Sequence, residues 1–466
     1  MDKGAEIELH IDSLALNGRA VARRDGLIFF VHDAVPGDVV RAQVSKLKRN
    51  YGEAETVEVL HPSVHRVPPK CKYFGTCGGC TWQHISYELQ LVEKQRRVAD
   101  AFERIGGFNN LPPHSIIASD DIYFYRNKME FSFSPRRWLT REEMQRENEF
   151  AGQFGLGLHV PGRYDKVLNI DECWLQSTLS SAILNTVREF AQQQKLSVYS
   201  TKTHDGYLRH VVIRQSKATD ELMVNLVTTT DEPDTMRKLC SVLHGWFPQV
   251  TTFVNNITTR KSMVASGDLE KVYYGPGYIT ERLGRYAFQN SANSFFQTNT
   301  KQAMHVYEIA KRLAELSLSD TVYDLYCGTG TIAIFISDAV RMVIGIDVVA
   351  SAIEDARLNV ELNGVQNCRF LLGDLKERLT KDTSWLGDKP DVVILDPPRS
   401  GLHASVVKEL ASLGPDRIVY ISCNPATQAR DAKMFSDSGY ELTDLQPVDM
   451  FPQTSHVENV AAFRKQ

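Results

Sequence analysis

The sequence predicts a multidomain protein with a small β-barrel at the N-terminus, an α+β domain in the centre and a doubly wound α/β domain at the C-terminus. With 466 residues, the chain is too long for one ordinary hydrophobic core. Short alternating strands fill its beginning, whereas regular strand–helix alternation starts near residue 290. We therefore expect domains at residues 1–61, 62–288 and 289–466.

The beginning of the chain has the strand and turn pattern of a small closed barrel. Alternation of apolar and polar residues recurs in EIELHIDSLA, LIFFVHD, DVVRAQVSKLKRN and EAETVEVL. Turn signals separate these runs at Asn17-Gly18, Asp25-Gly26 and Pro36-Gly37. Several short strands in so few residues are typical of an OB-like barrel. The pattern fits a packing module without a ligand equally well.

The central region combines a cysteine-rich loop, a long helix and several strands. A helical pattern covers about residues 86–105 and stops at Gly106 and Gly107. Strand patterns recur in KMEFSFSP, FGLGLHV, RHVVIRQ and ELMVNLV. The charged run TREEMQRENEF is typical of a solvated insertion. These patterns together predict an α+β domain.

From about residue 290 the pattern is that of a parallel sheet with helices on both faces. The apolar runs TVYDLY, MVIGID, CRFLLGD, DVVILDPP and RIVYISC alternate with helical segments. The final stretch, ELTDLQPVDMFPQTSHVENVAAF, has the pattern of two more strands. Ligands of such sheets bind beyond the carboxyl ends of the strands, so the functional residues are expected there.

Composition favours a cytoplasmic globular protein. The chain is 42% hydrophobic and 24% charged, and no apolar run approaches the roughly 20 residues that a membrane helix needs. Its acidic, alternating N-terminus lacks the pattern of a secretion signal. The net charge of −4 neither favours nor excludes a nucleic acid, because a basic face can coexist with acidic surface elsewhere. We expect no membrane partner and a monomer.

A candidate cofactor site lies at the end of the first strand of the C-terminal domain. The strand runs into a glycine loop, Asp324-Leu-Tyr-Cys-Gly-Thr-Gly-Thr, in which glycines allow close approach to a ligand. Asp347 ends the second strand, where it can accept hydrogen bonds from ribose hydroxyls, and Asp374 follows the third. A dinucleotide fingerprint would have a third glycine and room for a pyrophosphate. The loop therefore favours S-adenosylmethionine over NAD.

Two further strand ends carry groups suited to covalent catalysis. Asp396 lies in Leu-Asp-Pro-Pro-Arg-Ser-Gly, and Cys423 in Ile-Ser-Cys-Asn-Pro. A lone cysteine is as often buried filler as a nucleophile. A cysteine beside a methyl-donor site has one well-defined use, the methylation of carbon 5 of uracil, which is not nucleophilic enough by itself. The thiolate adds to carbon 6 of the uracil and thereby makes carbon 5 reactive toward the methyl donor. A base must then take the carbon-5 proton, and both His456 and Glu458 qualify.

Together these motifs closely resemble the RNA uracil-5-methyltransferase family, and in particular its iron–sulfur branch that acts on 23S ribosomal RNA. The resemblance spans nearly the whole chain, with a TRAM-like barrel, a cysteine-bearing central domain and a Rossmann-like methyltransferase domain. Its most specific parts are the motifs around Asp396 and Cys423, the His456-Val-Glu458 triplet and the Phe295-Phe-Gln-Thr-Asn run before the first strand.

The resemblance implies a role for each site residue. Cys423 is the nucleophile, and Glu458 is preferred over His456 as the proton acceptor. Contacts to S-adenosylmethionine and the target base are implied for Gln297, Tyr326, Thr331, Asp347, Asp374 and Asp396. Thr331 stands where relatives often carry Asn, and Asp347 where many carry Glu. Both residues keep the capacity to form hydrogen bonds.

A cysteine cluster forms a second candidate site. Cys71, Cys77 and Cys80 lie on one glycine-containing loop, and Cys173 can supply a fourth thiolate. Four sulfurs alone fit zinc or an iron–sulfur cluster equally well. The spacing resembles the 4Fe–4S site of the family, which implies such a cluster here. Structural, redox-sensing and RNA-positioning uses of the cluster all stay open.

The expected partner is structured RNA, from which the target base must be flipped out to reach Cys423. Phe295 and Phe296 can stack on a flipped base, with core packing as the alternative for one of them. Flanking RNA is expected to contact a basic group on the barrel or to run along the helix near residues 86–105. The barrel group, which also fits an ordinary solvated turn, is Lys46, Lys48, Arg49 and Tyr51, and the helix group is Lys94, Arg96 and Arg97.

Three rival functions stay open. Transfer RNA is the closest alternative substrate, because some relatives with the same domains act on it. An amino-methyltransferase of adenine or protein normally has an aromatic residue after the two prolines, where this chain has Arg399. A non-catalytic RNA-binding or RNA-remodelling protein would need neither Cys423 nor Glu458.

Overall fold

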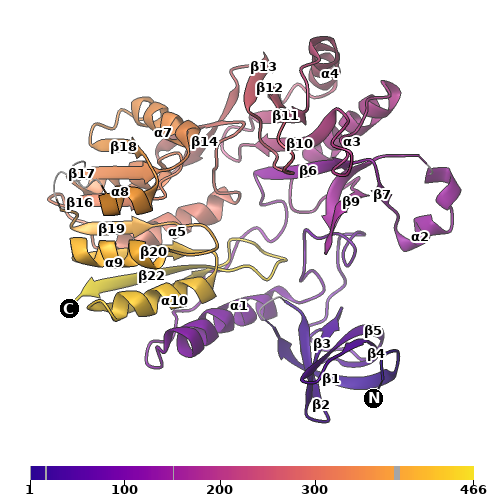
Figure 1. Ribbon diagram of the computed structural model, residues 1–466, viewed down its shortest axis with the longest axis horizontal. Helices are drawn as coiled ribbons and strands as arrows, with labels where there is room; N and C mark the ends of the chain where they lie inside the picture. Colours follow the sequence, from indigo (N-terminus) through magenta and orange to yellow (C-terminus); the bar gives the residue numbers. More distant parts are fainter. Residues whose placement is uncertain (1, 16–17, 151, 382–388) are drawn as a thin grey trace.

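The computed structural model has three domains and describes residues 2–15, 18–150, 152–381 and 389–466 (Figure 1). The barrel, drawn in indigo, and the central domain, in purple and magenta, lie on one side. The C-terminal α/β domain, in orange and yellow, lies on the other. A long helix, α1, runs from the barrel to the C-terminal domain.

The predicted barrel is confirmed as a closed five-stranded sheet with the order β1-β2-β3-β5-β4. Alternate residues of β1, from Ile7 to Ile11, point into the barrel core. Asp25 and Gly26 both adopt positive φ, as the tight turn between β2 and β3 requires. The predicted turn at Asn17 lies outside the described residues. The strands are β1 Glu6–Leu14, β2 Ala20–Arg24, β3 Leu27–His32, β4 Val39–Leu47 and β5 Tyr51–His61.

The central domain is built on an eight-stranded sheet with the order β13-β12-β11-β10-β6-β8-β9-β7. Helices α3 (Thr178–Gln193) and α4 (Pro233–Trp246) pack on it through a core that includes Ile183, Leu239 and Phe253. The charged insertion forms the short α2 (Arg141–Met144) and a 3₁₀ turn, Glu147–Phe150. The strands are β6 Lys128–Ser134, β7 Arg137–Trp138, β8 Gly155–Val160, β9 Arg163–Asn169, β10 Leu208–Gln215, β11 Leu222–Thr228, β12 Val250–Ile257 and β13 Leu269–Tyr274.

The C-terminal domain has a seven-stranded sheet with the order β18-β17-β16-β19-β20-β22-β21, in which β22 runs antiparallel to both of its neighbours and the other strand pairs are parallel. The strands are β16 Thr321–Leu325, β17 Met342–Asp347, β18 Cys368–Leu372, β19 Val392–Leu395, β20 Arg417–Ser422, β21 Tyr440–Val448 and β22 Glu458–Lys465. The helices are α5 Thr300–Leu313, α6 Thr331–Ile336, α7 Ala350–Leu362, α8 Leu375–Lys381, α9 Ala404–Leu413 and α10 Pro425–Ser436.

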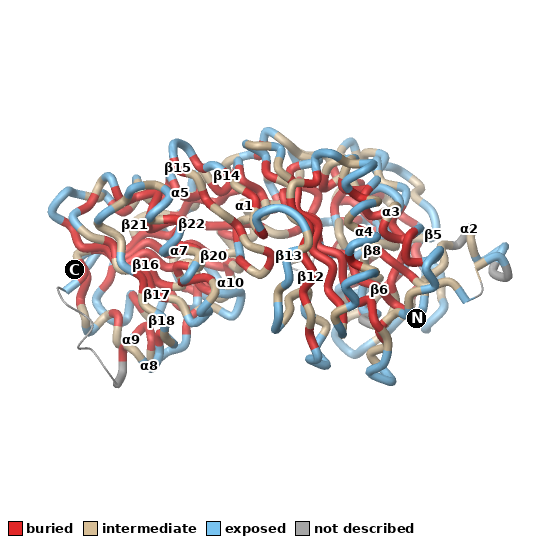
Figure 2. The backbone as a smooth tube through the Cα atoms, turned by 90° about the horizontal axis from the view of Figure 1, so that it is seen from above, coloured by how far each residue is buried: buried red, intermediate tan, exposed pale blue. Residues whose placement is uncertain are grey.

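Alternate strand residues of this sheet enter two cores on its opposite faces. Val322 and Ile394 pack with α5, α6 and α7, whereas Tyr323 and Leu395 pack with α8, α9 and α10. Figure 2 shows the buried strands of this domain and of the central domain as two separate bodies. The doubly wound prediction is confirmed.

Two segments from outside residues 289–466 pack on the C-terminal domain. Helix α1 (Tyr87–Ala101) continues as a π-helical turn to Gly106, and Val98 and Phe102 enter the core on the α10 face. The hairpin of β14 (Tyr278–Leu283) and β15 (Tyr286–Ser291) spans the predicted boundary at residue 288. Its Leu283, Tyr286 and Phe288 belong to the core that contains α5 and α6. Among the described residues, no helix combines the length and apolar character of a bilayer span.

Candidate functional site

The glycine loop after β16 brings the backbone to the edge of a cavity. Gly328 and Gly330 adopt positive φ, and a side chain at Gly330 would collide with the ring of Phe370. At Gly328 an added Cβ would meet no atom within 4 Å, so this backbone faces open space. The buried Asp324 accepts a hydrogen bond from Ala333 N at 3.0 Å and ties the loop to α6. Such a loop leaves room for a ligand against the main chain.

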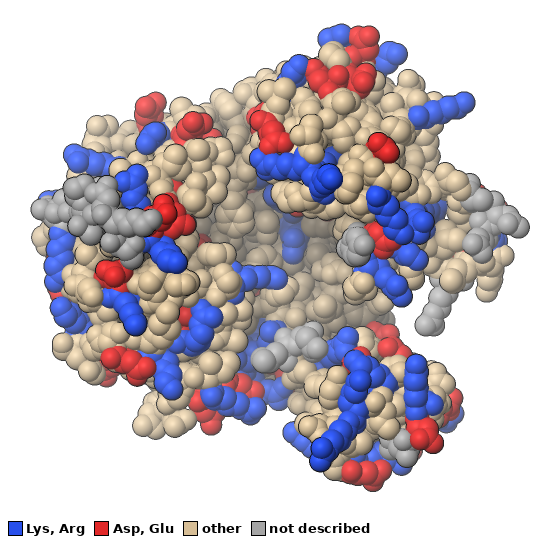
Figure 3. All heavy atoms as spheres, in the orientation of Figure 1, with Lys and Arg blue, Asp and Glu red and all other residues tan. Residues whose placement is uncertain are grey.

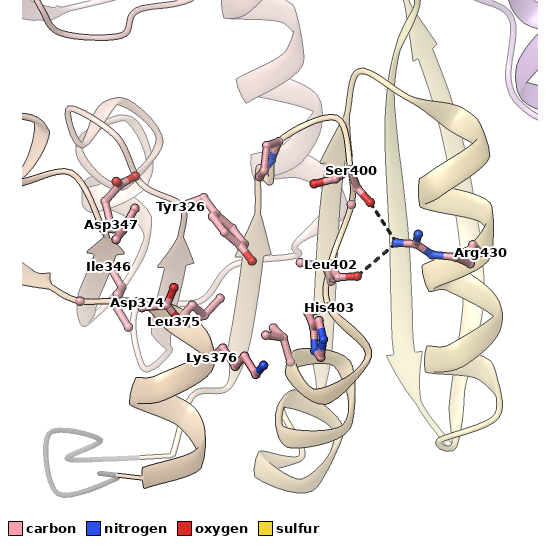
Figure 4. Close-up of a pocket in the computed structure, with 15 residues that line it drawn as sticks. Tyr326, Ile346, Asp347, Asp374, Leu375, Lys376, Ser400, Leu402, His403 and Arg430 are labelled. Atoms are coloured by element: carbon pink, nitrogen blue, oxygen red, sulfur yellow. Dashed lines mark hydrogen bonds between the residues drawn. The ribbon is translucent and has the colours of Figure 1, made fainter. Parts of the chain in front are cut away.

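The acids at the ends of β17 and β18 lie beside this loop. Asp347 accepts hydrogen bonds from Gly328 N at 3.0 Å and from Val349 N at 2.9 Å, which fixes the position of its carboxylate. Asp347, Asp374 and Tyr326 line a cavity of about 480 Å³ (Figure 4). The strand-end position of the acids fits an adenosine group, with Asp347 available to ribose hydroxyls.

A second cavity, of about 610 Å³, adjoins the first. The two share Tyr326, Asp347 and Pro398 in their walls. All eight predicted catalytic and cofactor residues line one or both cavities. Asp374 lines the first, and the second is lined by Gln297, Tyr326, Thr331, Asp347, Asp396, Cys423 and Glu458. The structure therefore brings the sequence-predicted set together around two adjoining cavities.

Cys423 lies between β20 and α10, and its surroundings oppose ionisation. Burial and the neighbouring Glu458 carboxylate raise the pKa of the thiol to about 11. A hydrogen bond and the positive charge of Arg399 act in the other direction. Sequence reasoning used Arg399 only to exclude another chemistry, although the Asp-Pro-Pro-Arg motif placed it beside the site. Arg399 is the group here that favours the reactive thiolate.

Asp396 and Glu458 form a pair of buried carboxyl groups in the same cavity. Burial raises the pKa of Asp396 to about 7, against a hydrogen bond from Gln297 Nε2 at 3.4 Å. Burial, followed by the charge of Asp396, raises the pKa of Glu458 well above its ordinary value. Two such carboxyl groups resist simultaneous ionisation, so the pair holds a proton near neutral pH. It can donate to a ring oxygen and accept a proton within one site.

His456, the competing base, is poorly placed for proton transfer. Burial and the nearby cations, first among them Arg399 and Arg97, lower the pKa of its ring to about 4. Arg399 Nη2 lies 3.3 Å from His456 Nε2. The ring is absent from the described residues that line the two cavities. A proton on His456 would therefore face several positive charges, which disfavours this ring as a proton acceptor.

The two phenylalanines before β16 have different surroundings. Phe296 is 4% exposed and packs on Phe288 with ring centroids 6.1 Å apart, so it belongs to the core. Phe295 is 60% exposed at the cavity and is free to stack on a base. Sequence reasoning missed Phe451, which also lines the cavity, and Asn127. Asn127 donates to Gln297 O at 2.8 Å from another domain, a contact that no local pattern signals.

The four cluster cysteines line one small cavity in the central domain. Gly79 N donates to Cys77 Sγ at 3.4 Å, and Gln83 Nε2 donates to Cys80 Sγ at 3.3 Å. Backbone amides also face the sulfurs of Cys71 and Cys173. Within the described part of the chain, no three His, Cys, Asp or Glu side chains are grouped closely enough to hold a single metal ion. Thiolate sulfurs are the donor type that both zinc and iron–sulfur clusters take, so this arrangement alone does not show an iron–sulfur centre.

The basic residues predicted on the barrel differ in their surroundings. Lys46 Nζ lies 2.7 Å from Glu53 Oε1, so its charge is partly neutralised, whereas Lys48 and Arg49 lie in the β4–β5 turn. Figure 3 shows a hollow between the domains. Lys and Arg side chains lie on the visible face of the barrel and on the central domain beside this hollow.

The expectation that α1 offers Lys94 to RNA is wrong, and Arg96 and Arg97, named with it, both form contacts within the protein. Lys94 is fully buried in an ion pair with Asp449. Arg96 pairs with Glu93 and donates to Leu14 O in the barrel. Arg97 donates to Ser455 O. All three therefore hold parts of the protein together.

Comparison with known proteins identifies the family of this chain. Residues 249–466 match the family described as tRNA (Uracil-5-)-methyltransferase, and residues 2–57 match the TRAM domain. An uncharacterised RNA methyltransferase from Chlorobaculum tepidum is 44% identical over 468 residues, which cover 99% of this chain and 97% of the relative. Another uncharacterised RNA methyltransferase, from Bacteroides thetaiotaomicron, is 42% identical, and the match covers 96% of this chain and 99% of the relative.

A solved structure is similar over nearly the whole chain. The tRNA (uracil-54, C5)-methyltransferase of Pyrococcus abyssi, in complex with S-adenosyl-L-homocysteine, superposes with a TM-score of 0.75. It is 32% identical, and the match covers 98% of this chain and 99% of that one.

The doubly wound sheet and the cavities at its strand ends define an S-adenosylmethionine-dependent methyltransferase. More particularly, the chain belongs to the RNA uracil-5-methyltransferase family and carries an N-terminal TRAM domain. The predictions of the family, of S-adenosylmethionine as methyl donor and of an RNA substrate are confirmed, whereas the iron–sulfur branch, its cluster and the 23S rRNA target are not shown.

Proposed function

We propose that the protein methylates carbon 5 of a uridine in 23S rRNA through a covalent adduct between Cys423 and the uracil. The observation that carries the chemistry is the common cavity of Cys423, Glu458 and Asp396 beside the glycine loop and Asp347. S-adenosylmethionine, when bound there, supplies the methyl group. Arg399 favours the thiolate, which adds to carbon 6 and leaves carbon 5 nucleophilic.

Glu458 completes the reaction in this proposal. After methyl transfer, its carboxylate takes the proton from carbon 5. The electrons of that C–H bond re-form the double bond between carbons 5 and 6, and the Cys423 thiolate leaves. The pKa of Asp396 is about 7, so this carboxyl group is partly protonated near neutral pH. Together with Gln297 it holds the polar groups of the uracil ring. Phe295 stacks on RNA at the exposed rim of the cavity.

Two variants test the assignment of nucleophile and base. Cys423→Ala is expected to abolish both turnover and the covalent RNA adduct. Glu458→Gln is expected to stop turnover but to accumulate the adduct, because elimination requires loss of the carbon-5 proton. Denaturing gels with 5-fluorouridine RNA provide the wild-type reference, since fluorine cannot leave as a proton. An adduct formed by Cys423→Ala would assign the nucleophile to another residue.

Two observations bear on which RNA is modified. The cysteine motif that resembles the 23S rRNA branch lines one cavity, which supports ribosomal RNA. The similarity to a tRNA (uracil-54, C5)-methyltransferase makes transfer RNA the second candidate. Mapping 5-methyluridine by mass spectrometry in both RNAs, from cells with and without the gene, decides between them. Loss of the modification from tRNA alone would overturn the ribosomal assignment.

We further infer that Cys71, Cys77, Cys80 and Cys173 hold a 4Fe–4S cluster. Protein purified without oxygen is expected to be brown, with broad absorbance and with iron and sulfide bound. Cys80→Ser should lose the colour, whereas Cys240→Ser should keep it, because Cys240 lies on α4 outside this cavity. Colourless protein with stoichiometric zinc would contradict the assignment.

A further inference from the structure

The loop of residues 449–457 determines how the chain enters the catalytic cavity at Glu458. This loop joins β21 to β22, and Glu458 is the first residue of β22, paired with Val448 at the end of the ladder. Phe451, from the same loop, lines the cavity. The sheet fixes one side of Glu458, so the loop must fix the other.

Helix α1 holds the loop through two buried contacts. Lys94 Nζ lies 2.6 Å from Asp449 Oδ1 and donates to Phe451 O at 3.0 Å. Gln453 N donates to Gln90 Oε1 at 2.9 Å, and Gln90 Nε2 donates back to Gln453 Oε1 at 3.2 Å. Gln453 is buried with a φ of 67°, a left-handed conformation that a residue other than glycine keeps only when its neighbours impose it.

The cysteine loop holds the same residues from a second direction. Thr81 N and Trp82 N both donate to Gln453 O at 3.0 Å. Ser455 N donates to Thr81 Oγ1 at 3.0 Å. Thr81 directly follows the cluster residue Cys80. The chain that wraps the cluster cavity therefore continues into hydrogen bonds with the loop before Glu458.

We propose that Thr81 and Gln90 are positioning residues for Glu458, so that the cysteine loop and α1 set the proton-removal step. The proposal rests on the proposed role of Glu458 as the base. A displacement of about 1 Å in a catalytic group can cost a large factor in rate. We expect binding of the methyl donor to be independent of these contacts, because the glycine loop, Asp347 and Asp374 follow other strands.

The test compares two threonines that flank cluster cysteines. Thr81→Val removes the acceptor of Ser455 N and is expected to lower turnover about threefold to tenfold, as loss of one hydrogen bond allows. It should also accumulate covalent RNA adduct as Glu458→Gln does, with S-adenosylmethionine affinity and bound iron unchanged. Thr76→Val is the control, because Thr76 adjoins Cys77 and its hydroxyl forms no hydrogen bond within the described chain. It should behave like the wild type.

Gln90→Met gives an independent variant that removes both bonds to Gln453, and with them the bonds that Gln90 Nε2 donates to Trp82 O and Ile85 O. It should show the same adduct accumulation. Wild-type turnover in both variants would overturn the proposal. So would lower turnover without accumulated adduct, because a general loss of structure slows adduct formation as well. If Glu458→Gln itself accumulates no adduct, the proposed function fails rather than this inference.

Discussion

At the scale of single residues, Cys423 is held by opposing charges. Burial and Glu458 raise the pKa of its thiol to about 11, and Arg399 lowers it. The thiol is therefore mostly protonated near neutral pH in the free protein. The reactive thiolate depends on Arg399, whose backbone carbonyl is in turn held by Asn424 Nδ2 at 3.0 Å. Asn424, the residue after Cys423, thus holds the backbone of the cation that lowers the pKa of the Cys423 thiol.

Alkylation of Cys423 should depend steeply on pH. Below a pKa of about 11 the thiolate fraction rises tenfold per pH unit, so the rate with iodoacetamide should rise about tenfold from pH 8 to pH 9. Arg399→Gln removes the stabilising charge, raises the pKa and should slow alkylation at pH 8. Arg399→Lys should retain more of the rate. Mass spectrometry of the Cys423 peptide measures this.

The control for this experiment is Arg282→Gln, on the exposed side of β14 outside both cavities. It should leave the pH dependence unchanged. A rate that stays constant between pH 7 and pH 9 would show that Cys423 is already a thiolate, and that the charge balance described here is wrong.

Among the helices, α1 has a special place, because it joins the barrel to the methyltransferase domain. Trp82 and Ile85, just before the helix, belong to the barrel core, while Val98 and Phe102 belong to a core of the methyltransferase domain. The fully buried Lys94–Asp449 pair lies between these ends. One helix therefore connects both domains, and its basic side chains are used in that packing.

Lys94→Met should destabilise the protein strongly. Asp449 would keep its buried charge without its cationic partner, which costs about 3–5 kcal/mol. We expect a clearly lower midpoint of thermal unfolding, measured by circular dichroism. Lys3→Met, on an exposed residue before β1, should leave the midpoint nearly unchanged. A Lys94→Met midpoint equal to the wild type would mean that Tyr87 and the Phe451 amide suffice to hold Asp449.

The sequence predicted the elements and residues whose signals are local. Strands of the two sheets followed from short apolar runs, and Cys423 and Asp396 from motifs at strand ends that a parallel sheet brings to one edge. Burial of Lys94 was not predictable, because it depends on a loop 355 residues away along the chain. The contact of Asn127 with Gln297 is equally long-range, joining positions 170 residues apart.

At the scale of the whole molecule, the barrel is bound tightly enough that its deletion is a poor probe of RNA binding. Trp82 and Ile85 close the barrel core, and Trp82 Nε1 donates to Gly18 O at 3.1 Å. Removing residues 1–61 would expose these apolar side chains and disturb the loop that holds Glu458. Charge substitutions on the barrel surface leave this packing intact and isolate the RNA contacts.

Lys48→Ala with Arg49→Ala should weaken RNA binding most at low salt. Each phosphate contact contributes roughly 0.7–0.9 to the slope of log affinity against log salt, so losing two should flatten the slope by up to about two. Lys46→Ala should have a smaller effect, because Glu53 already pairs with this side chain. Affinity for S-adenosylmethionine should not change. The matched control is Lys408→Ala with Lys433→Ala on the exposed sides of α9 and α10. An unchanged slope in the barrel variant would show that its β4–β5 turn is only solvated, and that the central domain must supply the phosphate contacts.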